Sequence, residues 1–328
     1  MEVLAQLDKI LLGRHHLHQQ ILIAVLARGH VLLEGMPGTG KTELIKALGE
    51  VLALDFKRIQ FTPDLMPSDI SGAHILQETS SGNREMQFKP GPVFTHILLA
   101  DEINRASPKT QAALLEAMQE QCVTLLGETR KLPSPFFVLA SQNPIDLEGT
   151  YALPEAQLDR FLFKLNVSGL DVEVMTQIIS GRRRGKPPAV DRTLSRQDLD
   201  LLFNVMDRIF IPKQVCRYIS RLVAATHSDS PEAPELIKEY VTFGASPRAA
   251  IAMAEASRAR ALLESRPTVG FEDVRQVALP VLNHRIITNY KAKIDRIGTA
   301  DLCETILSQL DETELNLPEG IQLAESHD

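Results

Sequence analysis

The sequence predicts an α/β domain with a mostly parallel sheet, followed by an all-helical domain. Between residues 1 and 170, short apolar runs alternate with segments of helical periodicity, which is typical of buried parallel strands separated by helices. From Ser195 onward the apolar spacing stays near that of a helix, and no convincing strand follows. A segment rich in glycine, proline and arginine at 181–191 separates the two patterns and predicts a solvated connection.

Five short apolar runs predict the strands of the sheet. They are His30–Glu34, Phe56–Gln60, His96–Ala100, Phe136–Ala140 and Leu162–Asn166. A helix is expected over Thr110–Glu120, because Ser107 is a good N-cap and Pro108 suits the first helical position. The expected organisation is a nucleotide-binding core over 1–170, a connector over 171–192, a helical domain over 193–290 and a tail over 291–328.

Composition excludes several classes of protein. The 328 residues carry 35 Lys and Arg against 42 Asp and Glu, so the net charge of −7 argues against a nucleic-acid-binding protein. No apolar run approaches the roughly 20 residues of a membrane span. Cys122, Cys216 and Cys303 lie too far apart for a disulfide framework or a metal motif, and the first residues do not resemble a signal peptide. We therefore expect a cytoplasmic protein.

A phosphate-binding loop lies between the first predicted strand and the helix after it. Eight consecutive residues match the pattern G-x-x-x-x-G-K-[ST], namely Gly35, Met36, Pro37, Gly38, Thr39, Gly40, Lys41 and Thr42. Glycines allow the backbone N–H groups to surround phosphates, and the helix N-terminus adds a positive dipole end. Lys41 is expected to bind the β- and γ-phosphates, and Thr42 to offer its hydroxyl to Mg²⁺. A small-molecule kinase would have the same loop, so this motif alone does not define the reaction.

An acidic pair, Asp101 and Glu102, follows the third predicted strand. An Asp at the carboxyl end of a strand beside the phosphate loop suits Mg²⁺ binding. A neighbouring Glu can orient and polarise the water that attacks the γ-phosphate, which a kinase does not need. The pair therefore favours hydrolysis over transfer to another acceptor.

Three further polar residues are candidates for the same chemistry. Asn143 follows the fourth predicted strand, and either contacts the γ-phosphate or water, or caps the turn before Pro144. Arg160 precedes the fifth strand, where it either faces a neighbouring subunit's nucleotide or forms an ordinary ion pair with Asp159 or Glu155. Arg248 lies in the first turn of a helix that begins at Ser246 and Pro247.

A cation opposes the helix dipole in that first turn, so Arg248 favours a phosphate partner over a simple surface position.

Three histidines near the N-terminus, His15, His16 and His18, do not have the spacing of a metal site. Only His15 and His18 share a helix face, His16 does not, and no cysteine or acid completes a metal site. We expect a solvated helix there.

The motifs together resemble the MoxR family of AAA+ ATPases over residues 3–290. The resemblance rests on GMPGTGKT, LLADEINRASPKTQAALLEAMQE, ASQNP, LPEAQLDRF and GASPRA, in that order. It implies a P-loop NTPase core with a parallel sheet of strand order 5-1-4-3-2, helices on both faces and a C-terminal all-α lid. It also implies hairpin insertions near 72–92, around Ser81-Gly82-Asn83, and near 121–133, around Gly127-Glu128.

Site roles follow from the resemblance by position. Gly35 to Thr42 would be the Walker A loop, and Asp101 and Glu102 the metal-binding and catalytic residues of Walker B. Asn143 would be sensor 1, Arg160 an arginine finger and Arg248 sensor 2, acting in cis or in trans. Gly13 falls where relatives contact adenine.

The resemblance implies a function as well as a fold. It indicates Mg²⁺-dependent ATP hydrolysis by a ring of identical subunits, expected to be a hexamer, that remodels or matures a partner protein. Relatives often act with a von Willebrand factor A-domain protein. Two alternatives remain open, an ATPase subunit of a metal-chelatase-like complex and a nucleotide-gated scaffold with little turnover. No nucleic-acid partner is expected.

Overall fold

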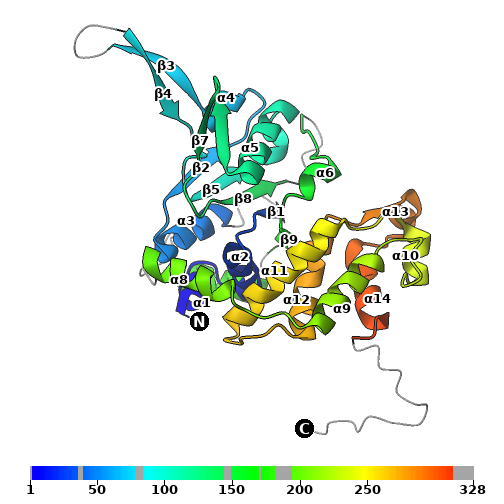
Figure 1. Cartoon of the computed structure of the whole chain (residues 1–328). Helices are drawn as coiled ribbons and strands as arrows, with labels where there is room; N and C mark the ends of the chain where they lie inside the picture. The colour runs from blue at the N-terminus through cyan, green and yellow to red at the C-terminus, as the bar shows by residue number, and fades with distance from the viewer. Residues whose placement is uncertain are drawn as a thin grey trace, which may run out of the picture.

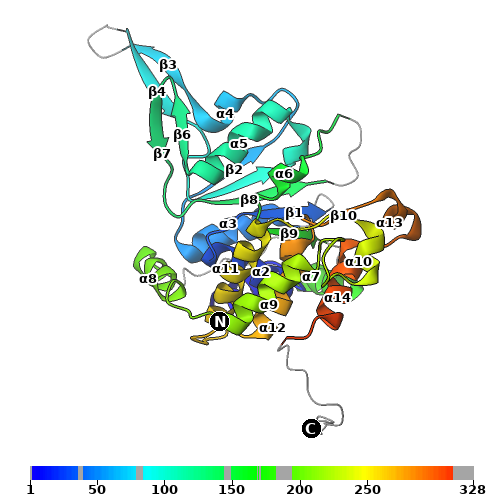
Figure 2. The ribbon, with the colours of Figure 1, turned by 45° about the vertical axis from the view of Figure 1, so that its right-hand side comes forward.

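The computed structural model describes residues 2–35, 40–78, 84–143, 149–167, 169, 171–181 and 194–312. A central sheet carries helices on both faces, and the helical second half of the chain lies against one of those faces (Figure 1). Turning the molecule shows two hairpins on the side of the sheet away from the helical half (Figure 2).

The sheet has five parallel strands. They are β1 (Val31–Gly35), β2 (Phe56–Gln60), β5 (Ile97–Asp101), β8 (Phe137–Gln142) and β9 (Phe163–Val167). Their spatial order is β2-β5-β8-β1-β9. If these strands are counted 1 to 5 along the chain, the order read from the β9 edge is 5-1-4-3-2, which confirms the order expected from the sequence. Because β1 lies between β8 and β9, the loop that follows it opens at the carboxyl edge beside the end of β8.

Alternate residues of the three inner strands β1, β5 and β8 supply two different cores. Leu32, Leu98 and Val138 belong to an apolar cluster with residues of α5. Leu33, on the opposite face of β1, belongs to a second cluster that includes Leu44 of α3 and continues into the helical half of the chain. Burial on both faces explains why the strands read as unbroken apolar runs rather than alternating patterns.

Helices and one short 3-10 turn precede the first strand or connect the strands of the core. They are α1 (Glu2–Ile10), α2 (His15–Leu26), α3 (Lys41–Leu52), α4 (Pro67–Ser71), η1 (Ile103–Arg105), α5 (Pro108–Glu120) and α6 (Glu155–Leu158). The predicted start of α5 is confirmed, since Pro108 is its first residue and the Ser107 hydroxyl accepts a hydrogen bond from the Thr110 amide at 3.4 Å.

Both expected hairpins are present. The first pairs β3 (Gly72–Glu78) with β4 (Arg84–Pro90), and the second pairs β6 (Cys122–Leu125) with β7 (Glu128–Lys131). The expected turn at Ser81-Gly82-Asn83 lies outside the described residues. The first hairpin projects from the body of the molecule in both views (Figures 1 and 2).

Two apolar residues of the projecting hairpin have different surroundings. Met86 is 60% exposed, opposite Leu76 on the paired strand. Phe88 instead packs against the rings of His74 and Phe94, with the Arg130 guanidinium 4.1 Å from its ring centre. Only the outer part of this hairpin therefore presents apolar side chains to solvent.

The second half of the described chain is almost entirely helical. Its helices are α7 (Val172–Gly181), α8 (Arg196–Met206), α9 (Lys213–Ala224), α10 (Glu235–Tyr240), α11 (Pro247–Leu263), α12 (Phe271–Leu282), α13 (Tyr290–Asp295) and α14 (Thr299–Gln309). α7 occupies the first half of the range expected to be a connector, and α13 and α14 occupy part of the expected tail. One short strand pair, β10 (Val241–Phe243) with β11 (Ile287–Thr288), was not expected from the sequence.

The N-terminal histidines correct a second expectation. His18 is fully buried rather than solvated, and its Nδ1 atom lies 2.6 Å from Asp8. His15, which is exposed, contacts the other oxygen of the same carboxylate. Asp8 lies on α1, so an acid from the preceding helix provides the partner that local spacing did not reveal. Within the described part of the chain, no helix is long and apolar enough to cross a membrane.

Candidate functional site

The phosphate loop joins β1 to α3 as the sequence predicts. Strand β1 ends at Gly35, and α3 begins at Lys41 after Gly40, whose φ of 83° is left-handed. This left-handed backbone favours glycine, and a Cβ atom at Gly40 would lie 2.5 Å from a terminal methyl group of Leu11, which would have to shift. Met36, Pro37, Gly38 and Thr39, the middle of the motif, lie outside the described residues.

A polar cavity of about 390 Å³ opens beside the start of α3, at the carboxyl ends of β1, β5 and β8. It is lined by Gly35, Gly40, Lys41, Thr42, Glu43, Arg58, Gln60, Asp101, Glu102, Ser141, Gln142 and Asn143. Seven of the residues singled out from the sequence thus meet around one space. The carboxyl edge of an open parallel sheet is the usual position of a ligand site in α/β folds.

Lys41 carries its charge into this cavity. Its Nζ atom donates a hydrogen bond to the carbonyl of Gly35 at 2.9 Å. Burial lowers the pKa of this lysine, and the carboxylates of Asp101 and Glu102 oppose that shift. A partly buried ammonium at a helix N-terminus favours an anionic ligand, because an added negative charge would offset the cost of desolvation.

Two donors hold the Asp101 carboxylate in place. The Ser141 hydroxyl donates to Oδ1 at 2.5 Å, and the Arg58 guanidinium donates to Oδ2 at 2.8 Å. Thr42 lines the same cavity. Hydroxyl and carboxylate oxygens suit Mg²⁺, which keeps several waters and needs few protein ligands.

These two oxygen donors fit a nucleotide-bound Mg²⁺ better than a metal held by protein alone. In the described residues, no group of three or more His, Cys, Asp and Glu side chains is arranged to hold a metal ion. A site with few protein ligands relies on phosphate oxygens and water to complete the coordination.

Glu102 has an unusual backbone and two side-chain donors. Its φ of 56° is left-handed, and its amide donates to the Ser141 hydroxyl at 3.0 Å. The Gln60 amide and the Arg105 guanidinium both donate to Oε2, at 2.8 and 2.9 Å. A non-glycine residue in this conformation is costly, and such residues occur often at functional sites. The surrounding contacts fix where this carboxylate points.

Sequence reasoning did not single out Arg58, Gln60, Arg105 or Ser141. One signal was available for Gln60, since it ends the strand that pairs with β5 and lies directly beside Asp101 in the register. The expected order places the second and third strands side by side, so both residues would be expected at the carboxyl edge of the sheet. The other three contacts depend on side-chain directions that a local pattern does not contain.

Asn143 follows β8 and lines the cavity, as expected. Its carbonyl accepts a hydrogen bond from the Asn104 side chain at 3.3 Å, which ties this strand end to the turn after β5. The turn before Pro144, the alternative explanation for this asparagine, reaches residues outside the described part of the chain.

Arg160 and Arg248 are not among the residues lining the cavity. Arg160 follows α6 and is half-buried, and among the described residues no ion pair joins it to Asp159 or Glu155. Asp159 instead pairs with Arg285 at 2.7 Å, and more distantly with Arg248 at 3.7 Å. Arg248, at the start of α11, has an exposed side chain.

Gly13 lies in the turn between α1 and α2, outside the cavity lining but near it. A Cβ atom there would lie 2.5 Å from Val174 on α7. Leu11, two residues earlier, contacts Gly40 at the end of the phosphate loop. This turn therefore lies between α7 and the start of α3.

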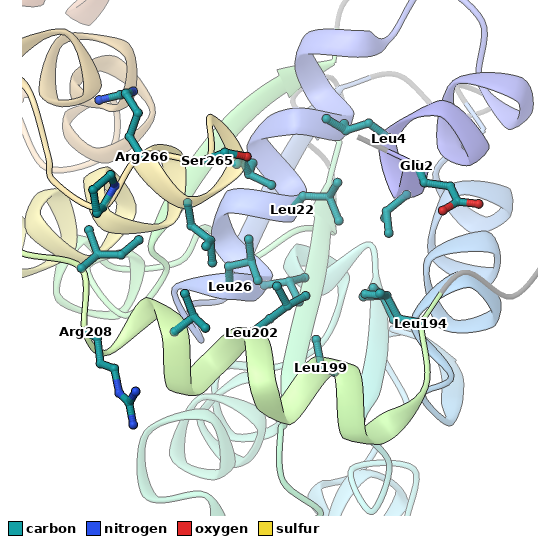
Figure 3. Close-up of a pocket in the computed structure, with 18 residues that line it drawn as sticks. Glu2, Leu4, Leu22, Leu26, Leu194, Leu199, Leu202, Arg208, Ser265 and Arg266 are labelled. Carbon is teal, nitrogen blue, oxygen red and sulfur yellow. The ribbon is translucent and has the colours of Figure 1, made fainter.

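A larger groove of about 640 Å³ lies elsewhere, between α2, α8 and the end of α11 (Figure 3). Its lining is mainly aliphatic, including Leu22, Leu26 and Leu202. Arg266, one of its few charged residues, already pairs with the buried Asp273. An apolar groove without convergent polar groups does not fit a nucleotide, so the smaller polar cavity is the candidate site.

Comparison with known proteins gives relatives along most of the chain. Residues 30–163 match the family model described as ATPase family associated with various cellular activities (AAA), and residues 234–306 match the AAA lid domain. The chain is 41% identical to "Chaperone MoxR1" of Mycobacterium tuberculosis, over 95% of this chain and 81% of that protein.

Two further relatives extend this likeness. "Protein MoxR" of Paracoccus denitrificans is 31% identical over 86% of each chain. A solved structure from Cytophaga hutchinsonii superposes with a TM-score of 0.86 at 41% identity, and the match covers 94% of this chain and 93% of that one.

Proposed function

Because the chain belongs to the MoxR family of AAA+ ATPases, we propose that it binds ATP with Mg²⁺ in the polar cavity and hydrolyses it. The observation that carries this proposal is the meeting of Lys41, Asp101 and Glu102 around one cavity at the phosphate loop. A cation, a metal-binding carboxylate and a second carboxylate are the groups that nucleotide hydrolysis requires.

Each of these residues has a distinct part in the proposed reaction. The backbone from Gly35 to Gly40 and the Lys41 ammonium bind the phosphates. Thr42 and Asp101 hold Mg²⁺, which neutralises the charge of the phosphate oxygens when bound. Glu102 orients a water molecule and accepts its proton, while the oxygen of that water bonds to the γ-phosphorus and the bond to ADP breaks.

Hydrogen bonds support the residue that activates water. Gln60 and Arg105 hold one oxygen of Glu102, and Ser141 fixes both the Glu102 amide and the Asp101 carboxylate. Positioning of this kind lowers the entropy cost of reaching the transition state. Asn143, at the next strand end, contacts the γ-phosphate or the attacking water in this proposal.

The remaining assignments concern an assembled ring. We propose a homo-oligomer, expected to be hexameric, in which Arg160 reaches the nucleotide of a neighbouring subunit and Arg248 senses the γ-phosphate in cis or in trans. Gly13 and its neighbours contact adenine. Support for a shared site comes from the position of Arg160 outside the cavity of its own chain.

The proposed biological role is chaperone-like. The helical region from 193 onward acts as a lid, and its motion against the 1–170 core transmits ATP turnover to a partner protein in the cytoplasm. A von Willebrand factor A-domain protein is a candidate partner. The name of the mycobacterial relative, a chaperone, and the exposed Leu76 and Met86 on the projecting hairpin support this role.

Steady-state ATP hydrolysis of Glu102→Gln tests the proposed reaction. We expect ATP binding to persist and turnover to fall by at least ~10²-fold, because amide cannot accept the proton of water. Glu50→Gln, an exposed change at the far end of α3, is the matched control and should keep wild-type turnover. Near-normal turnover in Glu102→Gln would overturn the assignment, and absence of turnover in the wild type with ATP bound would favour a nucleotide-gated scaffold.

A further inference from the structure

The loop that carries Arg160 is held from outside by the end of α12. Three consecutive residues there donate hydrogen bonds to backbone carbonyls of the segment 159–164. Asn283 donates to the carbonyl of Lys164 at 3.4 Å, and His284 to that of Phe161 at 2.9 Å. Side chains of the helical region thus contact the main chain of residues 159–164, the segment that carries Arg160 and is called the finger loop below.

Arg285 makes the densest of these contacts. Its side chain is only 3% exposed, and its Nε atom donates to the Asp159 carboxylate at 2.7 Å. The same guanidinium donates to the carbonyl of Asp159 at 3.1 Å and to that of Phe161 at 2.7 Å. These carbonyls belong to the two residues that flank Arg160 in the chain. One buried side chain therefore holds the peptide unit directly before Arg160 and the peptide unit directly after Phe161.

The other oxygen of Asp159 faces the start of α11. The Ser246 hydroxyl donates to Oδ2 at 3.1 Å, although Ser246 is the N-cap residue and makes no side-chain cap of its own helix. Arg248 approaches the same oxygen at 3.7 Å. The start of α11 and the turn that follows α12 thus contact one carboxylate beside Arg160, and the two helices pack against each other.

We propose that Asp159 and Arg285 are positioning residues for Arg160, through which the helical region sets the direction of that guanidinium toward a neighbouring copy of the chain. This inference rests on the proposed function, since it takes Arg160 to act in trans. Movement of α11 or α12 then moves Arg160. The nucleotide state sensed by Arg248 in one subunit is in this way passed to hydrolysis in the next.

A purely structural role would look similar in the folded protein, so the test needs a readout beyond stability. Displacement of a catalytic group by about 1 Å can cost roughly 10²-fold in rate while leaving substrate binding intact. Loss of a structural clamp in general would weaken every function of the chain together. The distinguishing result is a fall in kcat without a change in the affinity for ATP.

The first variant is Asp159→Asn, which keeps the size of the side chain and removes the charge. We expect kcat to fall by roughly 10²-fold while the Kd for ATP stays within about threefold. Arg285→Met tests the donor side, and Asp159→Asn keeps the inference testable if that variant does not fold. Arg221→Met is the matched control, because it breaks a two-bonded arginine–glutamate pair with Glu232 away from the loop. It should keep wild-type kcat.

Mixing subunits separates this inference from the proposed function. Glu102→Gln subunits have an intact finger loop and a dead site of their own. Mixed with Asp159→Asn subunits, they should raise turnover at least about tenfold above that of Asp159→Asn alone, because their Arg160 faces the active sites. A mixture of Glu102→Gln subunits with Arg160→Ala subunits is the reference for the turnover that is recovered.

Each outcome of the mixing experiment has a meaning. Recovery with both variants supports the inference. Recovery with Arg160→Ala but not with Asp159→Asn overturns the positioning role and leaves the proposed function standing. No recovery with Arg160→Ala overturns the trans assignment itself. An unchanged kcat in Asp159→Asn would also overturn the inference.

Discussion

At the scale of single residues, His30 makes the free energy of unfolding depend on pH, because this histidine is buried in the core beside the central sheet. The ring is buried between β8 and α5. Its Nε2 atom lies 3.2 Å from the carbonyl of Met118, and its Nδ1 atom accepts the Val138 amide at 3.0 Å. Only a neutral ring can donate from one nitrogen and accept at the other. Burial lowers the pKa of His30 to about 4.

This pKa gives the protein a pH-dependent stability. The unfolded chain binds the proton near pH 6.5 and the folded chain only near 4, so protonation favours unfolding. The contribution is complete above pH 6.5 and is lost as the pH falls toward 4. Between pH 7 and 5 we expect the free energy of unfolding to fall by about 2 kcal/mol through this residue.

Urea unfolding of the wild type and His30→Gln at both pH values measures that contribution. The variant cannot titrate at this position, so its stability should depend less on pH by about the same 2 kcal/mol. Other buried histidines, such as His284, contribute equally to both proteins and cancel in the difference. Equal pH dependence in the two proteins would contradict the assignment.

Much of the site was predictable at this scale. Lys41, Asp101, Glu102 and Asn143 each follow a strand or begin a helix, and parallel strands bring such positions to one edge of the sheet. The supporting contacts were not predictable, because the hydrogen bond from Gln60 to Glu102 depends on strand register and side-chain direction together.

At the scale of elements, Gln111 joins three separate segments around the acidic pair. It is fully buried on α5, and the two N–H groups of its side-chain amide are shared among the carbonyls of Ile103, Ala106 and Tyr151, which lie 3.0–3.2 Å from Nε2. These carbonyls belong to the turn after Glu102 and to the segment before α6. One side chain therefore joins the turn after Glu102 to the segment that leads through α6 to Arg160.

Gln111→Leu should destabilise the protein by about 2–3 kcal/mol, because buried carbonyls lose their donor and the cost of leaving such groups unpaired is large. Gln119→Leu, an exposed change on the same helix, is the matched control and should stay within about 0.5 kcal/mol. Chemical unfolding of both variants makes the comparison. Equal stability of the two would show that the contacts of Gln111 are not needed.

Long elements were predicted better than short ones. The strands of the sheet and the start of α5 follow from apolar runs and cap residues that act locally. Strands β10 and β11 have three and two residues, too few for a periodic signal, and they form because the helices around them bring the segments together. His18 was misjudged for the same reason, since its partner Asp8 lies on another helix.

At the scale of the whole molecule, the core and the helical half are joined by packing and by polar contacts. One apolar cluster runs from Leu33 in β1 through α2 into α11 and α12. The polar contacts of Asp159 and Arg285 lie where the same helices meet the end of the sheet. In the proposed ring, a movement of the helical half that carried Arg285 with it would shift the loop of Arg160, which faces another subunit.

Mass in solution tests the central claim, that the nucleotide site is shared between subunits. The Glu102→Gln protein is expected to hold ATP without hydrolysing it, so its mass is measured with ATP and Mg²⁺, with ADP, and without nucleotide. We expect a closed ring with ATP, at a whole multiple of the monomer mass and expected at six, and smaller species without nucleotide. A monomer under all three conditions would leave Arg160 without a neighbouring site and would contradict the account.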